Sequence, residues 1–266
     1  MINELFFTPG IHESSALAVF DGAVKYSGDP IYPFPLYLIG FTNRSGSNLI
    51  AEHLQSTGQF SGLQERFNWD AMPIDAAEFG AKSFPEFVTM IVDRGLVPGT
   101  VYGFKAGWDQ IAMLLRWRID TMFSGGVRVI HTIRRDLLEQ AVSFSIADQT
   151  KRWTSLVEGE PDASPVFRFE DIEGRVAGAA QANQLIAYLC SLFEIPRLEA
   201  YYEEFAADPI PSIHRIGEFA GLDLSQWVPT ETRLKKQADD TNIQFIERFR
   251  KATRQQILDV ASQYRA

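Results

Sequence analysis

The chain has 266 residues, of which 45% are hydrophobic and 22% charged, values typical of a folded chain that can bury a substantial core. Its formal net charge of −9 makes it a poor general binder of nucleic acid or of an anionic membrane surface, so a polyanionic ligand would need a local cluster of positive charge. A single cysteine excludes an intramolecular disulfide, and no apolar run of transmembrane length or signal-peptide start is present, so we expect a cytoplasmic protein.

The N-terminal third begins with an arm and a strand–loop–helix unit. Residues 1–34, with scattered glycine and proline, are predicted to be irregular, with short strands at best. The apolar run 36–39 is predicted to be a buried strand that ends at Gly40. Apolar residues at helical spacing then predict a helix over 49–57, which ends at Gly58.

Strands and helices alternate along the rest of the chain. A turn and a short strand are predicted at 58–63, and further strands at 101–104, 127–133 and 198–202. Helices are predicted at about 108–122, 136–150, 171–193, 210–221 and 243–263. This alternation indicates parallel βαβ units, so we predict one α/β domain over residues 1–266, with a parallel sheet of about five strands flanked by helices and a C-terminal basic segment and helix at 223–266. In such a sheet, ligands bind outside the carboxyl ends of the strands.

The loop after the first strand has the composition of an anion site. It reads Gly40-Phe41-Thr42-Asn43-Arg44-Ser45-Gly46-Ser47-Asn48. A glycine-bearing turn at a helix N-terminus presents backbone N–H groups and the positive end of the helix dipole to phosphate or sulfonate oxygens. Arg44 adds a positive charge, and Ser45, Ser47 and Asn48 add donors where the helix begins. An ordinary serine-rich helix cap is the weaker alternative.

The same loop departs from the pattern of nucleoside-triphosphate P-loops, G-x-x-x-x-G-K-[ST]. Ser45-Gly46-Ser47 stands where Gly-Lys-Ser would be, so the lysine is missing. A kinase would also need an acidic residue near the end of a later strand to hold magnesium, whereas the strand 127–133 ends in Arg134-Arg135. A nucleotide-dependent kinase is therefore the less favoured alternative.

A second anion site is predicted after the strand 127–133. Asp136 is a natural N-cap, which places Arg135 at the mouth of the next helix and Ser143 about two turns along it. Eight residues at about 100° each return to within about 80° of the starting face, so both side chains can contact one anion. Arg134 could instead pair on the surface with Asp136 or Glu170.

Arg-Ser-Gly-Ser after a first strand resembles the 5'-phosphosulfate loop of sulfotransferases that use 3'-phosphoadenosine-5'-phosphosulfate (PAPS), and more narrowly the bacterial trehalose-type sulfotransferases. The resemblance extends over about residues 36–255 and implies a P-loop-type fold. It also implies that Arg135 and Ser143 hold the 3'-phosphate of PAPS. Two such sites at two strand ends specify a nucleotide phosphorylated at both ends.

Glu65 is the candidate general base. It lies in Gln64-Glu65-Arg66-Phe67, at the carboxyl end of the predicted strand 58–63, and an attacking hydroxyl needs a base within hydrogen-bond reach. The trehalose-type enzymes resemble this chain in carrying a glutamate at a Glu-aromatic motif. Because Arg66 stands between Glu65 and the aromatic Phe67, an alignment shifted by one residue stays open. The alternative role for Glu65 is a surface carboxylate paired with Arg66.

Three other features match the family. Lys105, predicted to end the strand 101–104, could offset charge on the transferred sulfonate, and it precedes a Trp-Asp-Gln stretch found in trehalose-type members. Trp153 could stack on adenine or sugar, or pack in the core. The basic residues at 235–236 could cover the 3'-phosphate or lie in a solvated loop. Among the histidines, His131 is predicted to be a core residue, and His53, His12 and His214 are expected to be structural or solvated.

The resemblance therefore implies an enzyme that transfers a sulfuryl group from PAPS to a hydroxyl of a carbohydrate or glycolipid, without a metal. Glu65 would accept the hydroxyl proton, Arg44 and the loop amides would stabilise the sulfonate and the leaving 5'-phosphate, and Lys105 would assist. A PAPS-binding protein without turnover is a further alternative. We expect no nucleic-acid partner and no integral membrane association, and a homodimer stays open.

Overall fold

The computed structural model describes residues 8–154, 164–233, 239–262 and 264. Two compact units are distinguished, Met1–Ile133 with Ala182–Glu231 and Arg134–Gln181 with Thr232–Ala266, and each is described by itself. None of the helices in the described part of the chain combines the length and the apolarity needed to cross a membrane.

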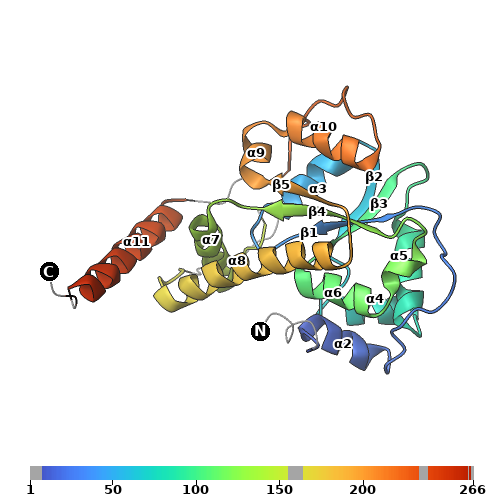
Figure 1. Cartoon of the computed structure of the whole chain (residues 1–266), viewed down its shortest axis with the longest axis horizontal. Helices are drawn as coiled ribbons and strands as arrows, with labels where there is room; N and C mark the ends of the chain where they lie inside the picture. Colours follow the sequence, from blue (N-terminus) through green and yellow to red (C-terminus); the bar gives the residue numbers. More distant parts are fainter. Residues whose placement is uncertain (1–7, 155–163, 234–238, 263, 265–266) are drawn as a thin grey trace. The chain divides into compact units, whose positions relative to one another are not determined.

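The first unit contains a five-stranded sheet (Figure 1). Its strands are β1 Leu36–Gly40, β2 Phe60–Gln64, β3 Val101–Ala106, β4 Val127–Ile133 and β5 Arg197–Tyr201. They lie in the order β2-β3-β1-β4-β5, and every neighbouring pair is parallel. The predicted α/β fold with a parallel sheet of about five strands is confirmed. The prediction for β3 was two residues short, because the strand continues through Lys105 to Ala106.

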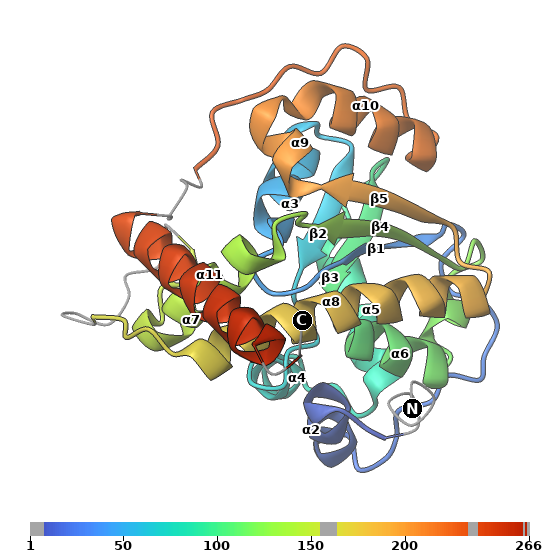
Figure 2. The same cartoon turned by 60° about the vertical axis from the view of Figure 1, so that its left-hand side comes forward.

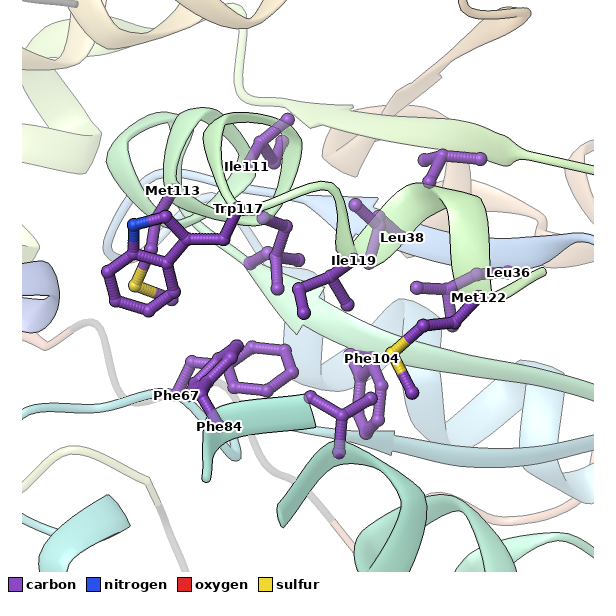
Figure 3. Packing of buried hydrophobic residues seen from close by; sticks show 14 of the residues in the cluster. Leu36, Leu38, Phe67, Phe84, Phe104, Ile111, Met113, Trp117, Ile119 and Met122 are labelled. Atoms are coloured by element: carbon purple, nitrogen blue, oxygen red, sulfur yellow. The ribbon is translucent and has the colours of Figure 1, made fainter. Parts of the chain in front are cut away.

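Helices cover both faces of this sheet (Figure 2). In the first unit they are α2 Ile11–Val19, α3 Ser47–Ser56, α4 Met72–Phe79, α5 Phe84–Gly95, α6 Trp108–Arg116, the 3-10 helix η1 Ile119–Met122, α9 Tyr202–Ala207, α10 Pro209–Ala220 and the C-terminal part of α8 Phe169–Leu192. Buried residues of α3, α9 and α10 form one apolar cluster with β1 and β4, among them Ile50, Phe205 and Ile213. A second cluster, shown in part in Figure 3, joins the other face to α5 and α6 and includes Phe67, Phe84, Phe104 and Trp117.

The expectation that residues 1–34 are irregular was wrong where α2 forms. Phe20, just after this helix, is buried against Phe84 and Phe87, with ring centroids 5.8 Å apart in each case. The carboxylate of Glu13 is buried and pairs with Arg116 of α6. These contacts reach residues about 65 to 100 positions away, so tertiary packing stabilises a helix that local sequence signals only weakly.

The predicted helix 108–122 is interrupted. The α-helix α6 ends at Arg116, and Arg118 takes a left-handed conformation (φ 58°) before η1 begins. A residue in this conformation cannot continue an α-helix, so the segment turns there.

The second unit is built from α7 Leu137–Thr150, the N-terminal part of α8 and α11 Asp240–Ala261. Its core contains Ala141, Val142, Ile172 and Phe245. The bounds of α7 and α11 agree with the predicted helices to within three residues at each end. Asp136 caps α7 as predicted, since its side chain accepts a hydrogen bond of 2.8 Å from the Glu139 N–H.

Candidate active site

The loop between β1 and α3 forms a cradle at a helix N-terminus. Gly46 is the N-cap of α3 with φ 92°, and a Cβ atom there would lie 2.4 Å from Cδ2 of Tyr202, so only glycine fits. Arg44 also takes a left-handed conformation, with φ 66°. The Ile50 N–H donates to the Gly46 carbonyl over 3.2 Å, so the N–H groups of residues 47–49 have no acceptor within the helix. This backbone suits a phosphate or sulfonate group.

The side chain of Ser45 has a structural role in this loop. It is fully buried, and its hydroxyl lies 3.0 Å from that of Thr132 on β4. The Ser45 N–H is also used, because it donates to the Thr42 carbonyl over 3.0 Å. Ser45 therefore ties the loop to the sheet, whereas the sequence had suggested that it offers a donor to a ligand. Ser47 is mostly buried too, while Asn48 is exposed at the start of α3.

A β-bulge between β2 and β3 sets which residue at the end of β2 faces Lys105. Gly62 pairs with Gly103, but Gln64 rather than Leu63 pairs with Phe104, so one residue is inserted between them. The next step along both strands brings Glu65 alongside Lys105, whereas regular pairing would bring Gln64 there. Gly62 (φ 77°) is required at this bulge, because a Cβ atom would lie 2.4 Å from the Gly103 carbonyl oxygen.

The result is a nearly buried ion pair at the carboxyl end of the sheet. Nζ of Lys105 lies 2.6 Å from Oε1 of Glu65 and also donates to Oδ1 of Asn48. Lys105 is 6% exposed, while the Glu65 side chain is 30% exposed. The structure thus brings together Glu65, Lys105 and the start of α3. The alternative prediction, that Glu65 is a surface carboxylate paired with Arg66, is wrong, since Nη1 of Arg66 lies 3.1 Å from Oδ2 of Asp75.

Glu65 has a second partner that the sequence analysis missed. Nδ2 of Asn68 donates to Oε2 of Glu65 over 3.1 Å, and Nε2 of Gln110 donates to Oδ1 of Asn68 over 3.1 Å. Burial raises the pKa of the Glu65 carboxyl, but the charge and hydrogen bond of Lys105 together with the bond from Asn68 outweigh it and hold the pKa below its usual range. Glu65 is therefore ionised at neutral pH, as a general base must be. The Trp-Asp-Gln stretch was the one sequence signal that pointed toward Gln110.

The histidines have structural surroundings. His131 is buried as predicted, with Nε2 3.1 Å from Asn183 Oδ1 and Nδ1 3.0 Å from Arg197 Nη1, and burial lowers its pKa to about 4. His53 packs against the rings of Phe205 and Trp227, and burial lowers its pKa as well. Both are therefore neutral core residues at neutral pH. In the described part of the chain, no three His, Cys, Asp or Glu side chains gather where they could hold a metal ion.

The residues predicted to bind the 3'-phosphate belong to the second unit. Arg135 is exposed directly before the N-cap of α7, and Ser143 is partly buried on that helix. Arg134, by contrast, is 9% exposed, and its Nη2 lies 2.6 Å from Oε2 of Glu139. Arg134 thus has a partner, Glu139, that the sequence analysis did not consider, and the Glu139 side of this contact is 45% exposed.

Two further predicted ligand contacts also fall in the second unit. The Trp153 ring is 38% exposed and lies 5.9 Å from that of Phe144. The ring is therefore only partly packed, and stacking on a ligand stays a prediction. The basic residues 235–236 lie outside the described residues.

Comparisons with known proteins identify the family of the chain. The Stf0 sulphotransferase family matches residues 36–252. The chain is 26% identical over 263 residues to the trehalose 2-sulfotransferase of Mycolicibacterium smegmatis (strain ATCC 700084 / mc(2)155), covering 81% of this chain and 94% of that protein. It is 27% identical over 169 residues to the trehalose 2-sulfotransferase of Mycobacterium tuberculosis (strain ATCC 35801 / TMC 107 / Erdman), covering 49% of this chain and 63% of the relative.

The fold has a counterpart among solved structures. The sulfotransferase domain of the Synechococcus PCC 7002 olefin synthase superposes with a TM-score of 0.52 at 14% identity, covering 85% of this chain and 98% of that one. At this identity the likeness concerns the fold alone. The match to the family over residues 36–252, which span most of the chain and include the β1 loop, Glu65 and Lys105, shows that the chain belongs to the Stf0 sulfotransferase family of transferase enzymes.

Proposed function

We propose that this enzyme transfers the sulfuryl group of PAPS to a hydroxyl of a carbohydrate. The observation that carries the proposal is the Glu65–Lys105 ion pair, 2.6 Å long, which lies at the carboxyl end of the sheet and also engages Asn48 at the start of α3. An ionised carboxylate beside an anion-binding helix N-terminus has the components of base-assisted transfer from an anionic donor. Trehalose, the sugar in the names of two relatives, supports a carbohydrate acceptor.

Donor binding is assigned to two groups of residues. The N–H groups at the start of α3 and the charge of Arg44 bind the 5'-phosphosulfate, and the glycine at position 46 allows the left-handed N-cap to pack against Tyr202. Arg135 and Ser143 bind the 3'-phosphate. Arg135 is exposed and therefore accessible to an anion, which supports this role.

Glu65 acts on the acceptor. It takes the proton of the attacking hydroxyl as the oxygen forms a bond to sulfur and the bond between sulfur and the 5'-phosphate oxygen breaks. Adenosine 3',5'-bisphosphate and a sulfate ester are the products. Arg44, the α3 amides and Lys105 stabilise the charge on the transferred sulfonate and the leaving phosphate.

Substitution of the base tests this function. With PAPS and trehalose as the first acceptor assayed, Glu65→Gln should lower kcat by about 10²–10⁴-fold because the amide cannot take a proton, while the affinity for adenosine 3',5'-bisphosphate stays nearly unchanged. Asp75→Asn is the matched control, since it also neutralises a carboxylate, one that pairs with Arg66 instead. Retention of most activity by Glu65→Gln on an accepted sugar would show that the base is another group.

Nucleotide selection tests the donor independently. Adenosine 3',5'-bisphosphate should raise the melting temperature more than AMP or ADP, and without magnesium, because it alone engages both groups of anion-binding residues. Equal shifts with AMP would contradict the two-site assignment. A larger shift with ATP and magnesium would favour the kinase alternative, which no contact in the described structure supports.

A further inference from the structure

A chain of three hydrogen bonds connects the backbone of α6 to Glu65. The Gly107 N–H, at the N-cap of α6, donates to Oε1 of Gln110 over 2.8 Å. Nε2 of Gln110 donates to Oδ1 of Asn68, and Nδ2 of Asn68 donates to Oε2 of Glu65, each over 3.1 Å. Gln110 is 2% exposed, so water competes little for its bonds.

The polarity of this chain has only one consistent solution. Each amide side chain can be turned by 180° to exchange its oxygen and nitrogen, but a backbone N–H can only donate. The Gly107 N–H therefore requires the oxygen of Gln110, which directs the Gln110 NH₂ toward Asn68. Asn68 must then present its oxygen to Gln110 and its NH₂ to Glu65. Glu65 consequently meets a donor, which favours its ionised form.

The two oxygens of Glu65 are held differently. Oε1 lies 2.6 Å from the Lys105 ammonium, a charge-assisted contact, whereas Oε2 accepts from the neutral amide of Asn68. An oxygen bound to a cation is the weaker proton acceptor of the two. The proton of an acceptor hydroxyl therefore goes to Oε2, on a lone pair that the bond from Asn68 leaves available.

We propose that Asn68 and Gln110 are positioning residues that orient Glu65 so that Oε2 accepts the hydroxyl proton. The three hydrogen bonds from the Gly107 N–H through Gln110 and Asn68 to Glu65 form a relay, and the Gly107 N–H sets its direction. This inference rests on the proposed role of Glu65 as base. The titratable groups that act on Glu65 from neighbouring elements are Lys105 of β3 and His12 of α2, and His12 lies 3.8 Å from Asp109 of α6. Substituting Asn68 or Gln110 leaves these groups in place. A change in the titration of Glu65 can therefore be attributed to the chain of hydrogen bonds.

Two substitutions of Gln110 distinguish a reversed relay from a broken one. In Gln110→Glu, the carboxylate accepts from the Gly107 N–H and needs a donor from Asn68, so Asn68 turns its oxygen toward Glu65. Gln110→Met has a similar length but no polar group and simply releases Asn68. Gln59→Glu is the matched control, because Gln59 is exposed just before β2 and gains the same charge.

The readout is the titration of the Glu65 carboxyl itself, followed by NMR on protein labelled with ¹³C at the glutamate side-chain carboxyls. The Glu65 signal is identified by its absence in Glu65→Gln. We expect its titration midpoint to move to higher pH in Gln110→Met and further in Gln110→Glu, with no change in Gln59→Glu. If Gln110→Glu does not fold, Asn68→Leu removes the same bond to Oε2 and should also raise the midpoint.

Turnover gives the catalytic part of the test. Gln110→Glu should lower kcat by about 10–100-fold, the usual effect of losing a supporting hydrogen bond, and the acidic limb of its pH profile should follow the NMR midpoint while the KM for the donor is unchanged. An unchanged Glu65 titration in both Gln110 variants would overturn the relay. Full activity of Glu65→Gln would instead overturn the base assignment, whatever the titration shows, so the two failures are distinguishable.

Discussion

Substitution of Lys105 by methionine tests whether the Glu65–Lys105 pair is as strongly coupled as its geometry indicates. Methionine keeps the length and the apolar stem of the side chain but removes the ammonium 2.6 Å from Oε1 of Glu65 and its bond to Asn48. Because position 105 is only 6% exposed, water cannot simply replace the lost cation. The carboxylate of Glu65 is then left partly buried without its main partner.

The magnitude follows from the distance and the burial. At 2.6 Å and an effective dielectric constant of about 20, the Coulomb attraction is about 6 kcal/mol, from which the desolvation of both groups must be subtracted. Breaking a fully buried pair costs about 3–5 kcal/mol. Water reaches the Glu65 side chain, which is 30% exposed, so we expect the free energy of unfolding to fall by about 2–3 kcal/mol at neutral pH.

The loss should depend on pH with a defined sign. Lys105 helps to hold the pKa of Glu65 below its usual range, so the stabilisation is present above the unfolded pKa and disappears as the pH falls through the folded pKa. In Lys105→Met the burial of Glu65 instead raises its pKa. The difference in stability between wild type and variant should therefore be largest at neutral pH and shrink in acid.

Urea unfolding at about pH 7 and about pH 4.5 measures this difference. Arg215→Met is the control in the same unit, because it removes the cation of a more exposed pair, with Arg215 Nη2 3.0 Å from Oε2 of Glu204. That variant should lose at most about 1 kcal/mol. An equal loss in the two variants, or a loss in Lys105→Met that does not change with pH, would refute the reasoning.

Three further predictions concern the loop, the bulge and the second unit. Gly46→Ala should lower stability by about 1–3 kcal/mol and weaken nucleotide binding, measured by thermal melting and titration, because the Cβ atom meets Tyr202 in a left-handed backbone. Gly62→Ala should lower the melting temperature and reduce kcat more than donor affinity, since relief of its contact with a β3 carbonyl displaces the residue that follows the bulge. Arg135→Ala should weaken binding of adenosine 3',5'-bisphosphate by about 10–100-fold in calorimetric titration. Arg134→Ala should weaken this binding less and mainly lower the melting temperature, because Arg134 is 9% exposed and pairs with Glu139. A larger loss of binding in Arg134→Ala would show that the two roles are exchanged.

The sequence by itself was sufficient to predict the parallel sheet and the approximate location of the candidate site. The run Leu36–Gly40 is buried at every position, and such continuous apolar runs next to glycine-rich loops are a local signal of parallel strands. The placement of Arg44 and Gly46 at a helix N-terminus follows from the same local order of strand, loop and helix. Glu65 was located at a strand end for the same reason, and the structure places it there.

Only the tertiary structure decided how these parts meet. The helix α2 forms through contacts with residues far along the chain, so no local pattern predicted it. We expected the Ser45 side chain to donate to a ligand. Instead it is buried, and its hydroxyl lies 3.0 Å from that of Thr132 on β4, 87 positions along the chain.

The same is true of the partners of Glu65. Its alignment with Lys105 requires the bulge between β2 and β3. A bulge is defined by the pairing of two strands, so the sequence of one short strand does not reveal it. The relay through Gln110 joins positions 42 residues apart and takes its direction from one backbone N–H. Local sequence determines which segments are strands and which loops follow them, whereas the orientation of the Glu65 carboxylate depends on hydrogen bonds between segments that are brought together only by folding.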